Sequence, residues 1–310
     1  MIDANNLPII DAHHHLWDLS LGAQPWLTTP PWLAFRYGDY AGIRRNFLLD
    51  DYRRVTAHWR LSASVTMEAE WDDARLVEET CWTAARHAEA PRHPAAHVAR
   101  SFLHLPGAAE ELARHAQYPF VKGIRHKPAA AARPDLIEWG AKAGMTDPAW
   151  RHGYRALAAH GFHFELQAPW WHVDELLDLV AAFPGTPVVI NHAFLPADRS
   201  PEAMAGWRKA VQRASAAPQV LMKISGIGLP GRRWSLDDNR AVIHHLVDSF
   251  GPDRAMFASN FPVDGLCGSF DTIYEGFMAA TADLPPTGRL KLFHDTAARV
   301  YRLDVPLAVP

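Results

Sequence analysis

Eight short apolar runs recur along the chain, and polar stretches separate them. The runs are rich in Val, Ile and Phe and cover residues 7–13, 61–70, 95–105, 119–126, 161–168, 186–194, 219–228 and 254–264. Four of the intervening segments carry helical signals, either apolar residues at helical spacing or an acidic first turn: 73–89, 172–183, 236–250 and 287–303. This alternation predicts an α/β protein that folds as a single-domain (β/α)8 TIM barrel.

The main alternative to a barrel is an open, doubly wound sheet. That fold usually has a glycine-rich turn after its first strand, where it binds a nucleotide. Here the first run ends in "DAHHH" (11–15), which contains no glycine. We therefore expect one barrel domain over residues 1–310 and no nucleotide cofactor, with "KPAAAARPD" (127–135) as a loop.

Composition narrows the function classes only slightly. The chain is 48% hydrophobic and 21% charged, with a formal net charge of −3, and no basic run suggests a nucleic-acid partner. Two cysteines, Cys81 and Cys267, are too few for a disulfide framework. No apolar run reaches the length of a membrane span, so we expect a cytoplasmic protein without a signal peptide or membrane partner. The sequence leaves a homo-oligomer open.

The histidine run at the end of the first predicted strand is the strongest candidate for chemistry. Strand alternation predicts that Asp11, His13 and His15 share one face and that His14 takes the other. Enzymes with this barrel fold have their active sites at the C-terminal ends of the strands. Two imidazoles on one face can converge on one ion or on one substrate oxygen. A single histidine at a strand end is usually structural, but this group favours a functional interpretation.

Other predicted strands also end in polar residues. The sixth run gives His192, the eighth gives Asn260 and Asp264, and the fourth gives Lys122 and Arg125. Lysine and arginine at a barrel rim often extend only their charged ends into solvent. Several cations at several strand ends instead predict a positive site for a substrate carboxylate, formed by Arg125 and, less directly, Lys122.

Aromatic residues are concentrated in two predicted loops near these strand ends. The loop at about 20–45 contains Trp26, Trp32 and Arg36, and the loop after the fifth run contains Trp170. Aromatic side chains usually belong to a core, but these lie in Pro-rich loops over the predicted site. Together with the cations they suit a planar or ring-shaped anion, so we assign all four to substrate binding.

Six segments in order resemble one family over nearly the whole chain: "IIDAHHHLWD", "VKGIRH", "VVINHAF", "LMKISG", "FASNFPVD" and "HDTAARVYRL". They are similar to the strand-end signatures of the amidohydrolase superfamily. The resemblance is to the branch that contains sugar-acid lactonases and 2-pyrone-4,6-dicarboxylate lactonase. It implies a hydrolase with a barrel fold and a site built from His13, His15 and His192.

Asn260 departs from the family pattern, which has an aspartate at this position. An amide cannot take a proton from water and binds metals more weakly than a carboxylate does. Three other groups could act as the base: Asp264, Glu68 with its neighbour Glu70, or His192. An equally weighted alternative for the two glutamates is a rim pair bonded to Arg or Lys.

The sequence therefore predicts hydrolysis of a lactone that carries a carboxylate or polyhydroxy substituent. His13, His15 and His192 would polarise the carbonyl group, either directly or as ligands of one divalent metal ion, zinc or manganese, and both versions stay open. Two alternatives remain. One is non-oxidative decarboxylation of an aromatic acid, and the other is a non-catalytic protein that binds a small molecule.

Overall fold

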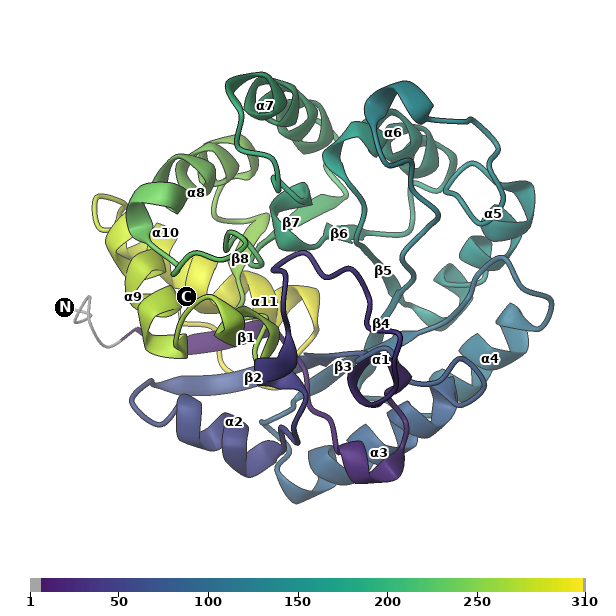
Figure 1. Ribbon diagram of the computed structural model, residues 1–310, viewed down its shortest axis with the longest axis horizontal. Helices are drawn as coiled ribbons and strands as arrows, with labels where there is room; N and C mark the ends of the chain where they lie inside the picture. The colour runs from purple at the N-terminus through teal and green to yellow at the C-terminus, as the bar shows by residue number, and fades with distance from the viewer. Residues whose placement is uncertain (1–6, 309–310) are drawn as a thin grey trace.

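The computed structural model describes residues 7–308, in which eight parallel strands form a barrel surrounded by helices (Figure 1). The strands are β1 (Ile9–His14), β2 (Leu61–Met67), β3 (Ala96–Arg100), β4 (Val121–Arg125), β5 (His163–Leu166), β6 (Val188–Ile190), β7 (Val220–Ile224) and β8 (Ala255–Phe257). Seven of them lie within the predicted runs, and β1 extends one residue beyond the first run, to His14. Neighbours pair in chain order from β1 to β8.

Helices follow the strands, and most of them cover the outside of the barrel. They are α1 (Pro25–Thr28), α2 (Leu49–Val55), α3 (Leu76–Glu89), α4 (Ala108–His115), α5 (Pro148–Arg155), α6 (Val173–Ala182), α7 (Pro201–Ser215), α8 (Leu236–Phe250), α9 (Phe270–Ala280), α10 (Pro286–Leu290) and α11 (Thr296–Val300). Three predicted helices are confirmed as α3, α6 and α8. The fourth, 287–303, is divided into α10, a π-helical turn at Lys291–Asp295, and α11.

Backbone hydrogen bonds between the ends of β1 and β8 close the barrel. The Asn260 amide donates to the His13 carbonyl at 2.8 Å, and the His15 amide donates to the Phe261 carbonyl at 2.7 Å. The predicted (β/α)8 barrel is confirmed. These two bonds also bring the end of the first strand, with its histidines, directly beside Asn260.

Two apolar layers fill the fold, as expected for parallel strands that are buried on both faces. The inner layer includes Ile10, Val65 and Met256, and Tyr301 beyond α11 packs with it from one end. The outer layer lies between the strands and the helices. Because the C-terminal segment packs against the interior from one end, the opposite end, where the strands terminate, is left for chemistry. Within residues 7–308, no helix has the length and hydrophobicity needed to cross a lipid bilayer.

The prediction that Asp11 shares a face with His13 is wrong. The Asp11 carboxylate accepts hydrogen bonds from Tyr52 of α2 at 2.9 Å and from Tyr274 of α9 at 3.3 Å, so it points into the outer layer. His14 stacks on the same Tyr52 ring. From Asp11 to His14 the chain advances by three residues along β1, whereas the paired stretch of β2, from Ser64 to Thr66, advances by only two. One extra residue in a strand reverses the alternation, and this separates Asp11 from His13.

Candidate active site

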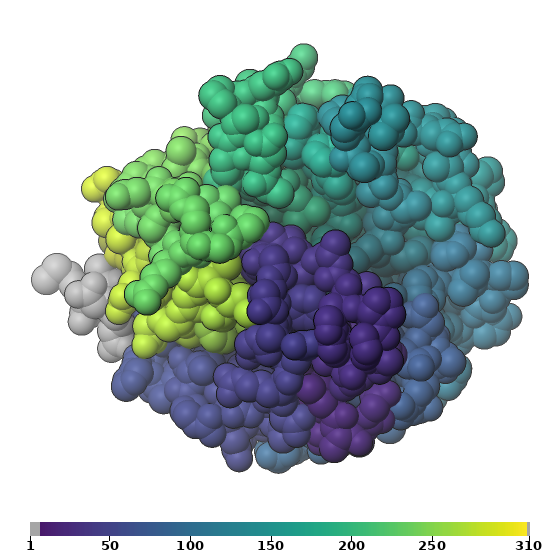
Figure 2. Space-filling model, viewed as in Figure 1, coloured from purple at the N-terminus to yellow at the C-terminus, as the bar shows by residue number. Residues whose placement is uncertain are grey.

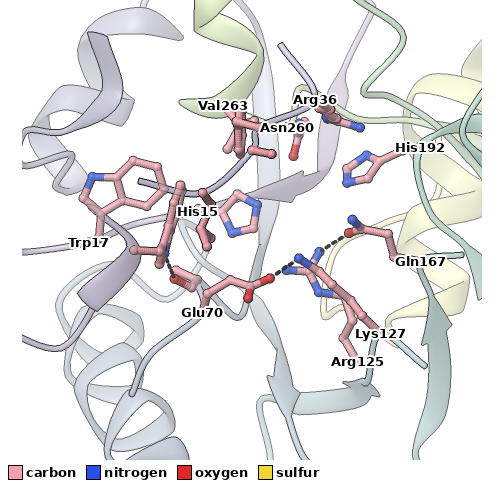
Figure 3. A pocket seen from close by; sticks show the side chains of 15 residues that line it. His15, Trp17, Arg36, Glu70, Arg125, Lys127, Gln167, His192, Asn260 and Val263 are labelled. Atoms are coloured by element: carbon pink, nitrogen blue, oxygen red, sulfur yellow. Dashed lines mark hydrogen bonds and ion pairs between the residues drawn. The ribbon is translucent and has the colours of Figure 1, made fainter. Parts of the chain in front are cut away.

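A cavity of about 250 Å³ opens at the C-terminal ends of the strands. The segment between β1 and α2 covers it, and in Figure 2 this purple segment lies across the middle of the visible face. The polar lining comes from six strand ends and from this segment: His15, Arg36, Glu70, Arg125, Lys127, Gln167, His192 and Asn260. Figure 3 shows His15 and His192 around the cavity, with Arg36 at one edge and Arg125 and Lys127 at the other.

Three residues that line the cavity have backbone conformations that side chains rarely adopt. The φ angles of Glu70, His192 and Asn260 are 56°, 53° and 54°. The left-handed region costs non-glycine residues free energy, and Asn tolerates it better than most. Eight non-glycine residues among those described have positive φ, so three at one cavity is a concentration typical of functional sites.

His13 and His15 face each other through their Nε2 atoms, which are 3.2 Å apart. The Nδ1 atom of His15 lies 3.2 Å from the Met67 carbonyl, which can only accept a hydrogen bond, so the His15 proton is on Nδ1. Burial and the nearby Arg125 lower the pKa of His15 to about 3, so the ring is neutral. Neutral His15 therefore presents a lone pair at Nε2 and has no N–H left for a carbonyl group.

His192 approaches the pair from β6. Its ring centroid lies 4.7 Å from that of His13, and its Nδ1 is 3.0 Å from the Ser225 hydroxyl. Burial, with added repulsion from Arg36 and Arg125, holds the pKa of His192 well below its usual range. The three histidines predicted from the sequence therefore lie together, and all are buried.

A glycine is required beside His192. Gly226 has a φ of 61°, and a Cβ atom there would lie 2.6 Å from Nδ1 of His192 and 2.8 Å from Nη2 of Arg36. Its amide also donates to Asp264 at 3.0 Å. The absent side chain therefore lets an imidazole and a guanidinium group approach the cavity together.

Arg125 is held by Glu68, its buried partner from β2. Nε of Arg125 lies 2.5 Å from Oε1 of Glu68, and Nη2 donates to the Glu68 carbonyl at 2.9 Å. Burial alone would raise the pKa of Glu68, but Arg125, Arg100 and Lys127 together lower it to about 2. Glu68 is thus held in a buried ion pair, as in the alternative interpretation of the two glutamates. Glu70 is likewise paired with Lys127.

Asp264 lies behind the cavity, with its carboxylate saturated by donors. Oδ1 accepts from Asn260 at 2.6 Å, from Tyr37 at 2.8 Å and from Arg36 at 3.4 Å, and Oδ2 accepts from the Gly226 amide. Such a carboxylate is positioned to orient Asn260 and Arg36. Its geometry does not favour the predicted role as the base that activates water.

Three predicted substrate-binding residues lie away from the cavity. Lys122 is near the N-terminal end of β4, where its carbonyl accepts from Arg302. Trp32 is 47% exposed, with the Arg44 guanidinium stacked on its ring at 4.0 Å. Trp170 packs against α7 at Gly206. Loop aromatics and rim cations are recognisable from sequence, but the direction of each side chain depends on how the loops pack.

Two polar residues of the cavity lining, and the partner of a third, were not assigned a role from the sequence. Gln167, just beyond β5, accepts from Nη1 of Arg125 at 3.4 Å, and Lys127 follows β4. Ser225, the partner of His192, lies just beyond β7. All three occupy positions next to a strand end. Selecting residues next to strand ends would find all three, although it would also select neighbours whose side chains point away from the cavity.

The facing histidines fit part of a metal site. Two imidazole nitrogens bound to one tetrahedral zinc at 2.0–2.1 Å would be about 3.3 Å apart, close to the observed separation. Over residues 7–308, however, no group of three or more His, Cys, Asp or Glu side chains is arranged to hold an ion. Asn260 offers only an amide, and Arg36, Arg125 and Lys223 add positive charge nearby. The donor set is therefore incomplete.

Comparisons with known proteins agree with this architecture. The family model for amidohydrolases (Amidohydro_2) matches residues 10–303. The uncharacterized protein y4mH of Sinorhizobium fredii is 33% identical over 96% of this chain and 100% of its own length. The L-fucono-1,5-lactonase of Burkholderia multivorans is 26% identical over 96% and 97% of the two chains. A crystal structure of an amidohydrolase from Burkholderia multivorans with bound zinc superimposes with a TM-score of 0.76. It is 25% identical and covers 95% of this chain and 99% of its own. The chain belongs to the amidohydrolase family.

Proposed function

We propose that this amidohydrolase hydrolyses a lactone that carries a carboxylate or polyhydroxy substituent. The observation that carries the proposal is a neutral histidine cluster in a cavity that also contains Arg36, Arg125 and Lys127. The named activity of the Burkholderia multivorans relative supports the reaction class. Guanidinium and ammonium groups suit a carboxylate or the developing oxyanion of an ester.

The proposed proton acceptor is His192. A ring that donates its Nδ1 proton to the Ser225 hydroxyl keeps a lone pair at Nε2. A water molecule attacks the lactone carbonyl carbon while Nε2 takes its proton. The C–O bond of the ring then breaks, and His192 returns the proton to the leaving ring oxygen. Arg36 and Arg125 stabilise the negative charge on the carbonyl oxygen or bind the substituent carboxylate.

In this scheme His13 and His15 position one another. Protonation of His13 at Nε2 lets it donate to Nε2 of His15, while its Nδ1 is buried without a partner. A bound zinc or manganese ion would instead supply a Lewis acid at the two Nε2 atoms, with both lone pairs directed to it. Because the donor set is incomplete, the steps above use only side chains of the protein.

A panel of sugar-acid lactones and 2-pyrone-4,6-dicarboxylate tests the proposal. Hydrolysis releases acid, which a pH indicator follows, whereas decarboxylation of an aromatic acid consumes a proton and releases CO₂. We expect acid release with at least one lactone and its loss in His192→Asn. Binding of lactones without turnover would identify a non-catalytic binder, and CO₂ release from an aromatic acid would identify a decarboxylase.

Metal removal tests the choice between the two arrangements of His13 and His15. We expect lactone hydrolysis to survive exhaustive treatment with a chelator and not to rise when zinc or manganese is added. Loss of activity with the chelator and its recovery with one divalent ion would show instead that the two histidines are ligands.

A further inference from the structure

We infer that the protein binds lactones extended by a second, neutral polyhydroxy unit, such as a sugar, which lies in a groove next to the catalytic cavity. This inference rests on the proposed lactonase function and names the substrate class more closely. The groove has a volume of about 580 Å³ and is lined by Pro25, Trp26, Thr29, Pro30, Pro31, Leu33, Glu70, Trp71, Asp72, Asp73 and Arg100.

The groove and the cavity share part of their walls. Trp26, Leu33 and Glu70 line both. The Trp26 indole is fixed at this boundary because its Nε1 donates to the Ala69 carbonyl at 3.1 Å. Figure 3 shows Glu70 at the cavity edge, extended toward Lys127. A substrate held at the histidines can therefore continue past Trp26 and Glu70 without leaving the protein surface.

The two hollows differ in the charged groups that line them. The cavity lining has three cations, Arg36, Arg125 and Lys127, and one carboxylate, Glu70. The groove lining has three carboxylates, from Glu70, Asp72 and Asp73, and one cation, Arg100. Arg100 pairs with Asp73 at 3.1 Å and also donates to the Trp71 carbonyl, and Glu70 pairs with Lys127, which leaves the Asp72 carboxylate outside these ion pairs. The groove lining therefore has no cation left to bind a second anion, while its carboxylates can accept hydrogen bonds from hydroxyl groups.

The other walls suit the apolar faces of a sugar ring. Trp26 contributes a partly exposed indole ring and three prolines add rigid apolar surface, while Trp71, at 3% exposed, lies at the base of the groove. Large, flat side chains with nearby polar groups can bury the C–H face of a ring and leave its hydroxyls for the carboxylates. A groove with carboxylate acceptors, apolar walls and no free cation favours a lactone whose far end is a neutral polyol.

Filling the groove without touching the cavity separates its role from catalysis. Thr29 lines the groove and is exposed, and its exposed neighbour Thr28 does not line it. Thr29→Trp would occupy the groove, and Thr28→Trp adds the same side chain next to it. Circular dichroism of both variants checks that each is folded.

Calorimetry with stable aldonates tests the groove independently of turnover. The probes are gluconate and three disaccharide acids, maltobionate, cellobionate and lactobionate. We expect at least one disaccharide acid to bind wild type roughly tenfold more tightly than gluconate, the effect of one or two additional hydrogen bonds. Thr29→Trp should remove this difference and leave gluconate binding unchanged, whereas Thr28→Trp should retain it.

Two results would overturn the inference: no disaccharide acid binding more tightly than gluconate, or Thr29→Trp weakening gluconate equally. Hydrolysis of the matching lactones separates the two proposals. Preferred binding of an extended acid without hydrolysis of any lactone retains the groove and refutes the lactonase function. Hydrolysis of simple lactones without a preference for extended ones retains the lactonase function and refutes the groove.

Discussion

At the scale of single residues, the site depends on partners that fix each reactive group. Ser225 holds Nδ1 of His192 at 3.0 Å, and Asp264 holds both Asn260 and Arg36. A general base typically contributes 10²- to 10⁴-fold to a rate. We therefore expect His192→Asn to lower kcat for a lactone by about that factor, with a smaller loss for Ser225→Ala and little change in KM for either. His152→Asn, an exposed histidine on α5, serves as the control. Equal kcat in wild type and His192→Asn would refute the proposed base.

The buried pair of Arg125 and Glu68 gives a prediction about stability. Arg125 is 2% exposed and Glu68 1%, so removing one partner leaves an uncompensated buried charge. Such a loss typically costs about 3–5 kcal/mol. Arg125→Met should lower the free energy of unfolding by about this amount, and Arg125→Met with Glu68→Gln should recover much of it. Urea denaturation measures both. If the double variant is no more stable than the single one, the buried charge of Glu68 does not need Arg125 to compensate it.

At the scale of elements, a left-handed turn follows β6. His192, Ala193, Phe194 and Leu195 have φ angles of 53°, 56°, 61° and 55°. This conformation costs an L-residue roughly 1–2 kcal/mol, and glycine tolerates it. We expect Ala193→Gly to leave the free energy of unfolding unchanged or to raise it by about 1 kcal/mol. Ala214→Gly, at a buried position in right-handed α7, should lower it by about 1 kcal/mol or more. Similar losses in both variants would show that the turn is not strained.

The left-handed turn after β6 and the bulge in β1 were not predicted from the sequence. Apolar periodicity located all eight strands, because burial on both faces of a parallel sheet leaves continuous apolar runs. The strand-end rule also located His13, His15 and His192. Strand alternation failed for Asp11, because one extra residue in β1 reverses alternation and no local pattern announces it. The expectation that loop aromatics face the site misplaced Trp32 and Trp170, whose directions depend on loop packing.

At the scale of the whole molecule, the charge is weakly acidic, while the cavity lining holds more cations than carboxylates. The net charge is −3, yet Arg36, Arg125 and Lys127 face the cavity. Salt shortens the screening length from about 10 Å at 0.1 M to about 3 Å at 1 M. We expect KM for an anionic lactone to rise severalfold over this range and KM for a neutral lactone to stay nearly constant. Equal changes for both substrates would show that the cavity does not attract the substrate by its charge.

The pH dependence of kcat/KM tests most directly the claim that neutral histidines perform the hydrolysis. Burial lowers the pKa of His15 to about 3 and holds the pKa of His192 well below its usual value. A group with a lowered pKa stays neutral as the pH falls through 7, and it gains a proton only at much lower pH. The acid limb for the best lactone should therefore lie well below the ordinary histidine pKa of about 6.5. An acid limb centred near pH 6.5 would contradict the account, because it would show that the essential imidazole titrates as an exposed histidine does.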